Sequence, residues 1–198
     1  MKLLVATGNA GKVREFQALL EGFELVRPGD LGLDLEVEED RPDFEGNARK
    51  KARAYAAASG LPTLADDSGL EVDALGGAPG VHSARYAGAE GPGKDAANNA
   101  KLLAALEGVT NRRARFRCVL VLVHPDGRPW AQAEGACEGR IGRALQGEGG
   151  FGYDPLFYPD DAPGRAMAEL SREEKNALSH RGRATRHLAN ALTPKSAR

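Results

Sequence analysis

One segment, from Ala114 to His124, is apolar on both faces of the strand that it predicts. One face carries Phe116, Cys118, Leu120 and Leu122, and the other carries Val119, Val121 and Val123. Because a strand with two apolar faces has to be covered on both sides, we predict the central strand of a sheet. Pro125-Asp126-Gly127 predicts a turn, and residues 129–141 predict the hairpin partner. Antiparallel pairing is therefore expected beside any parallel pairing, in a mixed sheet.

Weaker periodic signals on both sides of this strand predict an α/β fold. The expected elements are a strand at 3–6 that leads through a glycine loop into a helix stopped by Gly22, a helix at 44–59 stopped by Gly60, strands at 63–65 and 70–74 separated by a bend, a helix at 94–107, and a last helix of about 20 residues that opens with Ser171-x-x-Glu174. The acidic stretch from Asp30 to Glu45 predicts a loop or an edge strand.

Residues 1–198 are interpreted as a single domain, with a possible split into a helix-covered sheet and a smaller hairpin lobe. The tail at 193–198 is expected to be disordered.

With 27 Lys and Arg against 28 Asp and Glu, the chain lacks the basic surface of a protein that coats extended nucleic acid. No apolar run has membrane-spanning length and no signal peptide is recognisable, so we expect no membrane partner and an intracellular, cytoplasmic location. Cys118 and Cys137 have no spacing typical of a zinc site or a disulfide framework.

The loop after the first strand reads Thr7-Gly8-Asn9-Ala10-Gly11-Lys12. Its backbone N–H groups and the start of the following helix favour an anion, and Lys12 adds a full positive charge, so phosphate is the expected ligand. The loop is not a Walker A motif, because the two glycines are too close together and Val13 replaces the required Ser or Thr. An ordinary strand-to-helix turn explains the same spacing equally well.

Asp66-Asp67, followed by Ser68, predicts a site for a divalent cation, and Mg²⁺ suits a phosphate ligand. Neighbouring strand residues point to opposite faces, so one carboxylate can bind the metal while the other holds a water or a lysine. Glu38 or Glu39 from the acidic stretch can complete the ligands. A solvated turn and a solvated charge run are the simpler interpretations of both patterns.

In the second half of the chain, Phe151-Gly152-Tyr153-Asp154 offers aromatic rings, backbone groups and a carboxylate for a nucleotide base. Lys175 precedes His180 and Arg181 by one to two helical turns, so these side chains can approach one ligand. Plain packing of the aromatic residues and a basic helix end are the alternatives.

Together, these motifs resemble the inosine triphosphate pyrophosphatases, also called XTP/dITP diphosphatases. The matching motifs are Ala6-Thr7-Gly8-Asn9-x-Gly11-Lys12, Phe44-x-x-Asn47-Ala48, Ala65-Asp66-Asp67-Ser68-Gly69-Leu70, Leu75-Gly76-Gly77-x-Pro79-Gly80-Val81, Ser83-Ala84-Arg85-Tyr86, Gly149-Gly150-Phe151-Gly152-Tyr153-Asp154-Pro155 and Glu174-Lys175-Asn176-x-x-Ser179-His180-Arg181. The resemblance implies a long central mixed sheet with helices on two lobes, a nucleotide cleft between the lobes, and a homodimer. It also implies hydrolysis of ITP, dITP and XTP to the monophosphate and pyrophosphate.

The resemblance also assigns roles to residues. Asp67 takes the place of the proton acceptor and metal ligand, and Glu39 that of the second Mg²⁺ ligand, although Glu38 competes for this role. The substrate-binding positions are Thr7 to Lys12, Lys51, Ser68, Phe151 to Asp154, Lys175, His180 and Arg181, of which the last three and the Phe151 loop are expected to face the base. The sequence leaves open the preference among ITP, dITP and XTP, the role of Asp66 and the dimer surface.

Two other functions remain compatible with the same residues. The phosphate-binding groups also suit a pyrophosphatase for other altered nucleotides, which would differ only in its base pocket. A nucleotide-binding module without catalytic activity is the alternative outside enzymes, and only the absence of turnover would distinguish it.

Overall fold

The computed structural model describes residues 1–20 and 22–192, so the tail expected to be disordered, 193–198, lies outside the described residues. The strands are β1 Lys2–Val5, β2 Glu24–Val26, β3 Thr63–Val72, β4 Arg113–Val123, β5 Pro129–Ile141 and β6 Phe157–Pro159. The α-helices are α1 Ala10–Gln17, α2 Phe44–Ser59, α3 Lys94–Ala105, α4 Arg172–Leu178 and α5 His180–Leu192. No helix within the described ranges combines the length and apolar character required to cross a membrane.

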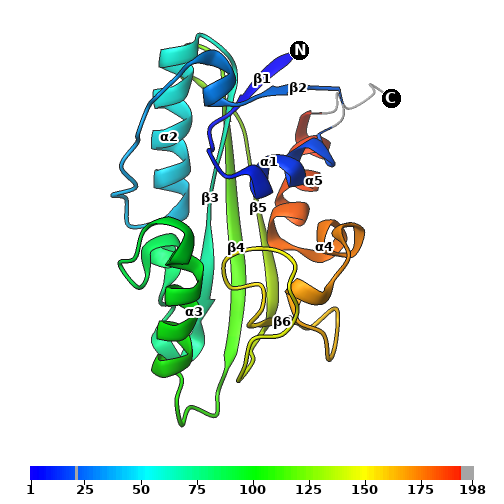
Figure 1. The fold of residues 1–198 in the computed structure, drawn as a ribbon. Helices are drawn as coiled ribbons and strands as arrows, with labels where there is room; N and C mark the ends of the chain where they lie inside the picture. Colours follow the sequence, from blue (N-terminus) through cyan, green and yellow to red (C-terminus); the bar gives the residue numbers. More distant parts are fainter. Residues whose placement is uncertain (21, 193–198) are drawn as a thin grey trace. The chain divides into compact units, whose positions relative to one another are not determined.

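The strands form one sheet in the order β2-β1-β3-β4-β5-β6 (Figure 1). β1 pairs in parallel with β2 and β3, and β5 pairs antiparallel with β6. The predicted mixed sheet is therefore confirmed, as is the interior position of the strand that begins near Ala114. All six residues from Cys118 to Val123 are buried, as expected for a strand covered on both faces.

Residue contacts divide the chain into two compact units. Unit 1 comprises Met1–Asp67, Cys118–Gly135 and Arg181–Arg198, and unit 2 comprises Ser68–Arg117 and Ala136–His180. Each boundary within β3, β4 and β5 leaves part of the strand in one unit and part in the other. Each unit has a hydrophobic core of its own.

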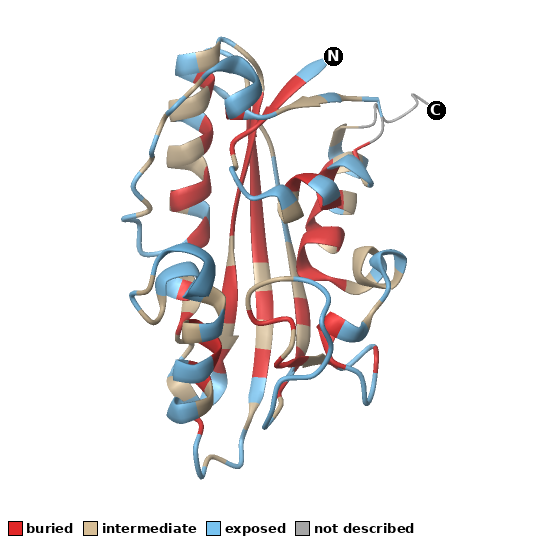
Figure 2. Ribbon diagram, in the orientation of Figure 1, coloured by how far each residue is buried: buried red, intermediate tan, exposed pale blue. Residues whose placement is uncertain are grey.

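The core of unit 1 packs side chains from β1, β3 and β4 against α1 and α5. Its fully buried members include Leu3, Phe16, Leu64, Leu120 and Leu188. Helix α2 buries a narrow stripe of Ala48, Ala52 and Ala56, which Figure 2 shows along one side of the helix. The one-turn spacing of these alanines places them on a single face, and their small side chains allow a close approach of the helix backbone.

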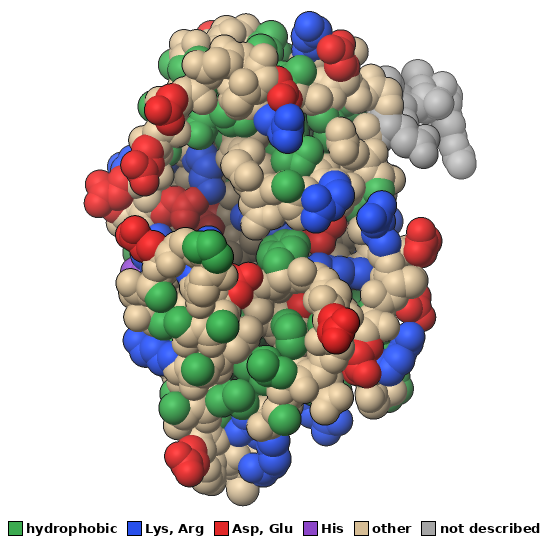
Figure 3. Space-filling model, viewed as in Figure 1, with side chains coloured by type: hydrophobic (Ala, Val, Ile, Leu, Met, Phe, Trp, Pro, Cys, Tyr) green, Lys and Arg blue, Asp and Glu red, His purple; other side chains and the backbone are tan. Residues whose placement is uncertain are grey.

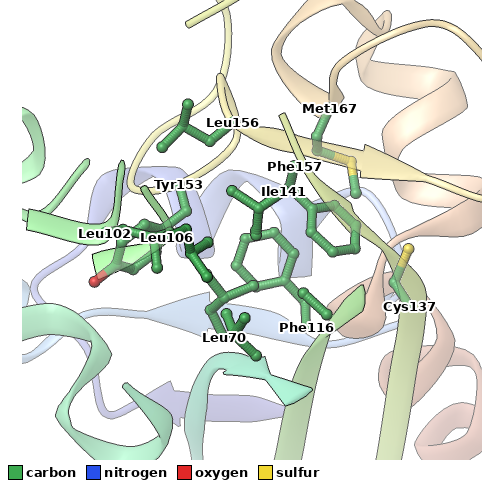
Figure 4. Packing of buried hydrophobic residues seen from close by; sticks show 12 residues of the cluster. Leu70, Leu102, Leu106, Phe116, Cys137, Ile141, Tyr153, Leu156, Phe157 and Met167 are labelled. Carbon is green, nitrogen blue, oxygen red and sulfur yellow. The ribbon is translucent and has the colours of Figure 1, made fainter. Parts of the chain in front are cut away.

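The core of unit 2 is built around aromatic and aliphatic side chains from β4, β5, α3 and the loop after β5 (Figure 4). The Phe116 and Phe157 rings lie 4.6 Å apart at an angle of 56°. Leu102 and Leu106, one turn apart on α3 and just beyond it, are fully buried in the same cluster. This core fixes the loop that carries Phe151 to Asp154.

Two predicted element boundaries are wrong. Asp66, Asp67 and Ser68 do not form a bend between two strands, because β3 runs without interruption from Thr63 to Val72. The predicted last helix is two helices, α4 and α5, separated by Ser179 in an extended conformation (φ −68°, ψ 155°). The helix at 44–59 and its stop at Gly60, which has φ 66°, are confirmed.

Candidate active site

The loop between β1 and α1 is organised by its own side chains. The Asn9 carboxamide oxygen accepts hydrogen bonds from the N–H groups of Gly11 (2.8 Å) and Lys12 (3.3 Å), and it thus caps α1. The Thr7 hydroxyl oxygen accepts from the Asn9 N–H at 3.1 Å. Helix α1 begins at Ala10, inside the predicted loop. Gly8, Asn9 and Ala10 are exposed, so the helix N-terminus and its positive dipole end face solvent.

Lys12 turns toward Asp66 and belongs to a buried network of four charges. Its Nζ lies 2.7 Å from Asp66 Oδ2, and Arg181 lies 3.3 Å from the same oxygen. Nη1 of the same guanidinium group donates to Glu15 Oε2 at 2.5 Å. Burial alone would raise the pKa of Asp66, but the charges of Lys12 and Arg181 outweigh it and hold the pKa below its usual value. Asp66 is therefore an anion in this network.

Asp67, the next residue on β3, lies in a different environment. Its side chain accepts a hydrogen bond from Asn47 Nδ2 at 2.9 Å, and only 5% of the residue surface is exposed. Burial, followed by the negative charge of Glu39, raises the pKa of Asp67 to about 6. The side chains of β3 alternate between faces, which explains how two adjacent carboxylates come to have opposite pKa shifts.

Lys51, on α2, connects these two carboxylate environments. Its ammonium group forms an ion pair with Glu39 and donates to the Asp66 backbone carbonyl at 3.0 Å. Burial lowers the pKa of Lys51, but the charges of Asp66 and Glu39 raise the pKa by more than burial lowers it, so the net shift is upward. Asn47 and Lys51 lie one helical turn apart, so a single face of α2 presents both groups.

The acidic loop before α2 supplies Glu39, and Figure 3 shows Asp and Glu side chains gathered over this loop. Glu39 is half-buried beside Lys51, whereas Glu38 is exposed. Lys50 holds the neighbouring Asp40 at 2.8 Å. In residues 1–20 and 22–192, no group of three or more His, Cys, Asp and Glu has an arrangement suited to a metal ion.

In unit 2, the loop that contains Phe151 and Asp154 is closed on itself by Asp154. Asp154 Oδ2 accepts from the Phe151 N–H at 2.9 Å and from Lys175 Nζ at 2.8 Å. The same ammonium group lies 4.6 Å from the centre of the Phe151 ring. Gly150 has φ 76°, and a Cβ at this position would collide with the Asp154 carboxylate, so only glycine fits here. Lys175 and Phe151 are thereby presented together.

Helix α3 holds both backbone polar groups of Gly152, its N–H and its carbonyl. The Asp95 carboxylate accepts from the Gly152 N–H at 2.8 Å, and Asn99 Nδ2 donates to the Gly152 carbonyl at 2.9 Å. Tyr153 points away from this face into the core, where its hydroxyl donates to the Ser83 carbonyl at 2.8 Å. No residue of the helix predicted at 94–107 was among the predicted site residues, so Asp95 and Asn99 were both missed.

The break at Ser179 sends successive residues to different units. His180, in unit 2, is 7% exposed and its ring is stacked on Phe116 with 4.8 Å between centres. Arg181, in unit 1, is fully buried against Glu15 and Asp66. Both carboxylates hold its guanidinium group, and the expectation that Arg181 faces the base beside Lys175 and His180 stays a prediction. Ser68 is half-buried on β3 in unit 2.

Comparison with protein families identifies the chain. The model of the Ham1 family matches residues 3–191. The chain belongs to the Ham1 family. This confirms the membership predicted from the sequence motifs, since relatives of the family carry the name dITP/XTP pyrophosphatase.

Two such relatives come from Desulforamulus reducens and Methylococcus capsulatus. The first is 56% identical, with 97% of this chain and 96% of the relative covered. The second is 54% identical, with 96% of each chain covered. The Ham1 protein structure from Coxiella burnetii is 41% identical, has a TM-score of 0.86, and covers 97% of this chain and 98% of its own. A structure named nucleoside-triphosphatase / dITP/XTP pyrophosphatase, from Mycobacterium abscessus, is 47% identical, has a TM-score of 0.75, and covers 98% of this chain and 100% of its own.

Within this Ham1-family chain, sequence reasoning missed one further charged residue. Glu15 neutralises the charge of Arg181 in an ion pair. The one feature of the sequence that could have pointed to this role is the position of Glu15 near Lys12 on the predicted helix. Asn47 stood in a motif of the resemblance without an assigned role, and its contact with Asp67 supplies one.

Proposed function

We propose that this protein hydrolyses ITP, dITP and XTP to the nucleoside monophosphate and pyrophosphate. The observation that carries the proposal is the environment of Asp67, a buried carboxylate with a pKa of about 6 beside Glu39 and Lys51. Membership in the Ham1 family and the names of its relatives support the choice of substrate.

Asp67 is proposed as the group that orients and deprotonates a water for attack on the α-phosphorus. A base is most effective when its pKa lies close to the working pH, and a pKa of about 6 is better suited to this task than that of an ordinary aspartate. Asn47 holds one carboxylate oxygen through a hydrogen bond of 2.9 Å and so fixes the direction of the other. Attack at this phosphorus releases pyrophosphate, with the bridging oxygen as leaving group.

The cations of unit 1 are proposed to bind the triphosphate. Lys12 and Lys51 both lie close to Asp66, and the exposed backbone of Gly8 to Ala10 lies at the start of α1. Fixed positive charges and helix N-termini stabilise the charge that develops on a leaving phosphate. Thr7, Asn9 and Gly11 then shape this loop, through the hydrogen bonds that cap the helix.

Mg²⁺ is the proposed cofactor, and the donor set fits it. Two carboxylates, Asp67 and Glu39, are near enough for the charge of Glu39 to raise the pKa of Asp67, and Mg²⁺ prefers few protein carboxylates together with water and phosphate oxygens. Glu39 is proposed rather than Glu38 because it is half-buried beside Lys51. When bound, the ion neutralises negative charge on carboxylates and phosphates.

The groups of unit 2 are proposed to bind the base. Phe151, Gly152 and Asp154 with Lys175 offer a ring face and polar groups, and His180 and Ser68 are the further candidates. ITP and XTP carry an oxygen at purine C6 where ATP carries an amine. A donor aimed at C6 is left unpaired by ATP, which costs about 1–3 kcal/mol per donor, or roughly 5- to 150-fold in selectivity. The preference among the three substrates, the predicted homodimer and the cytoplasmic location stay predictions.

A product assay with the purified protein and Mg²⁺ tests the proposal. ITP, dITP, XTP, ATP and GTP are supplied separately, and pyrophosphate and orthophosphate are quantified. We expect pyrophosphate from the first three and little product from ATP, and Asp67→Asn should lower turnover by at least about 100-fold. GTP, which also carries an oxygen at C6, tests whether the amine at C2 is rejected. Orthophosphate as the product, or equal turnover of ATP and ITP, would contradict the proposal. Nucleotide binding without any turnover would favour a binding module.

A further inference from the structure

Unit 2 contains a pocket whose lining shares no residue with the candidate active site. The cavity has a volume of about 570 Å³ and is lined by the segment before β4, the end of β5 and one residue of β6. Its lining residues are Thr110, Asn111, Arg112, Arg113, Arg140, Ile141, Gly142, Arg143 and Tyr158. We call this cavity the arginine pocket. A volume of this size accommodates a small molecule.

Most of the positive charge of the arginine pocket has no carboxylate to balance it. Arg113 pairs with Asp160 at 2.9 Å and approaches Glu138 at 3.8 Å. For Arg112, Arg140 and Arg143, no carboxylate within residues 1–20 and 22–192 forms an ion pair with the guanidinium group. Glu107 lines an adjoining hollow together with Arg112 and Arg143, and it forms no ion pair with either. Uncompensated positive charge therefore accumulates here in a chain with a net charge of −1.

Arg112 is fixed in place by backbone carbonyls. Its guanidinium group donates to the carbonyl oxygens of Ile141 (2.8 Å), Leu106 (2.8 Å) and Gly142 (2.6 Å). These bonds use three of the five N–H donors of Arg112 and do not neutralise its charge. Burial, together with the positive charge of Arg143, lowers the pKa of Arg112, which agrees with two guanidinium groups close enough to repel each other. An anion between them would relieve that repulsion.

The other arginines are displayed around this fixed charge. The Arg140 guanidinium lies 5.6 Å from the centre of the Tyr158 ring, on an exposed part of β5. Arg143 is exposed two residues past Ile141, and in Figure 3 Lys and Arg side chains gather at the lower end of this unit, near the beginning of β4. Planar guanidinium groups bind phosphate oxygens through paired N–H donors, and they do so better than the point charge of lysine.

We propose that the arginine pocket binds a small anion with two or more phosphate groups. Three guanidinium groups without a carboxylate partner among the described residues line one cavity, and a diphosphate or longer chain offers them more charge and more oxygen acceptors than a single phosphate does. Free pyrophosphate and the phosphate chain of a nucleotide share this chemistry. The site does not depend on the function proposed for unit 1, because none of its residues belongs to that set.

The test is a titration of the full chain with pyrophosphate, without divalent cations, in EDTA and 150 mM NaCl, followed through backbone amide NMR signals. We expect the signals of residues 110–113 and 140–143 to shift in the wild type. Arg140→Gln together with Arg143→Gln should weaken the affinity measured from these signals by at least about tenfold. The matched control is Arg49→Gln with Arg128→Gln, which removes one half-buried and one exposed arginine of unit 1 that no proposal uses.

Weaker pyrophosphate binding in the Arg140→Gln/Arg143→Gln variant, but not in the control variant, supports the arginine pocket. An ATP affinity equal to or above the pyrophosphate affinity, measured from the same signals, also supports it. An ATP affinity above that of pyrophosphate identifies the nucleotide as the source of the phosphates, and equal affinity identifies the phosphates alone. Unshifted signals, equal losses in both double variants, or sulfate binding as tight as pyrophosphate would overturn the proposal. Signals of residues 7–12 report the candidate active site separately, so its behaviour does not affect the result.

Discussion

Asp66 and Asp67 are neighbours in the chain and opposites in their chemistry. Lys12 and Arg181 hold Asp66 ionised, whereas burial and the charge of Glu39 push Asp67 toward its protonated form. The alternation of a strand is sufficient to separate them, because the two side chains meet different groups on the two faces of β3. One carboxylate thus organises the cations and the other is available for proton transfer.

The raised pKa of Asp67 predicts that the ionised side chain destabilises the metal-free protein. The pKa rises from 3.8 in the unfolded chain to about 6 when folded, so stability is lost as the pH rises from about 4 through 6. Asp67→Asn, which cannot ionise, should raise the free energy of unfolding at pH 7.5 by about 1–3 kcal/mol. Urea unfolding in EDTA measures this effect. At pH 4 or below the difference should shrink toward zero, and a variant less stable than the wild type at pH 7.5 would contradict the prediction.

A second prediction concerns the binding of Mg²⁺ at Asp67. Protonation competes with a metal ion for the same carboxylate, so the affinity for Mg²⁺ should fall as the pH drops through about 6. Calorimetric titration between pH 5 and 8 tests this. In Glu39→Gln the negative charge that helps to raise the Asp67 pKa is absent, so the midpoint should move to lower pH while the affinity also falls. An unshifted midpoint would mean that burial alone sets this pKa.

Arg181 gives a third prediction at the residue scale. Its removal leaves Glu15 and Asp66 buried without the guanidinium group that they share, so Arg181→Met should lower the free energy of unfolding by about 3–5 kcal/mol. The control Arg128→Met breaks only a fully exposed pair with Asp126 and should leave stability unchanged. Thermal unfolding of both variants separates the cases. A small effect at Arg181 would show that the lysines near Asp66, Lys12 and Lys51, neutralise it without the guanidinium group.

At the scale of elements, α3 does more than cover the sheet. Asp95 holds the N–H of Gly152 and Asn99 holds its carbonyl, so this helix determines where the backbone of the proposed base-binding loop lies. Neither residue type carries a signal for this role, because the contact joins segments that are far apart in the sequence.

Asn99→Ala removes one of these two hydrogen bonds, and the KM for ITP should rise about 5- to 30-fold with kcat nearly unchanged. Asp95→Asn preserves an oxygen acceptor for the Gly152 N–H and should stay close to the wild type, which makes it the conservative control. Steady-state kinetics with ITP distinguishes the two. A fall in kcat with unchanged KM would place Asn99 in the chemical step rather than in positioning the loop.

The elements predicted well are those whose signals are local. The helix at 44–59 has an N-cap at Asp43 and a left-handed glycine at its end, and β4 has two apolar faces. The two wrong element boundaries lie at residues that long-range contacts bury, and a local sequence pattern does not reveal such contacts. Asp66-Asp67-Ser68-Gly69 has the composition of a turn, yet distant Lys12, Arg181 and Asn47 satisfy its carboxylates inside a strand. Ser179 breaks a helix without Pro or Gly, at a position where it and its two successors are buried.

At the scale of the whole molecule, three strands belong to both units, since the boundaries fall within β3, β4 and β5. Breaking either core therefore removes the cover from strands that the other also uses, and we predict a single cooperative unfolding transition. Trp130, the only tryptophan, packs against the core of unit 1, and its fluorescence reports that unit. Its urea transition should coincide with that of far-UV circular dichroism. Separated midpoints would show that the units unfold independently.

Each core also contains one cysteine, Cys118 in unit 1 and Cys137 in unit 2, and both are fully buried. Burial raises the pKa of the Cys118 thiol to about 12, so an alkylating reagent finds neither access nor thiolate while the chain is folded. Modification of either side chain then has to wait for its surroundings to open. The two cysteines are therefore natural probes of local unfolding, one in each unit. Mass spectrometry of the two cysteine peptides after a timed alkylation pulse would measure how fast the core of each unit opens, without any engineered probe.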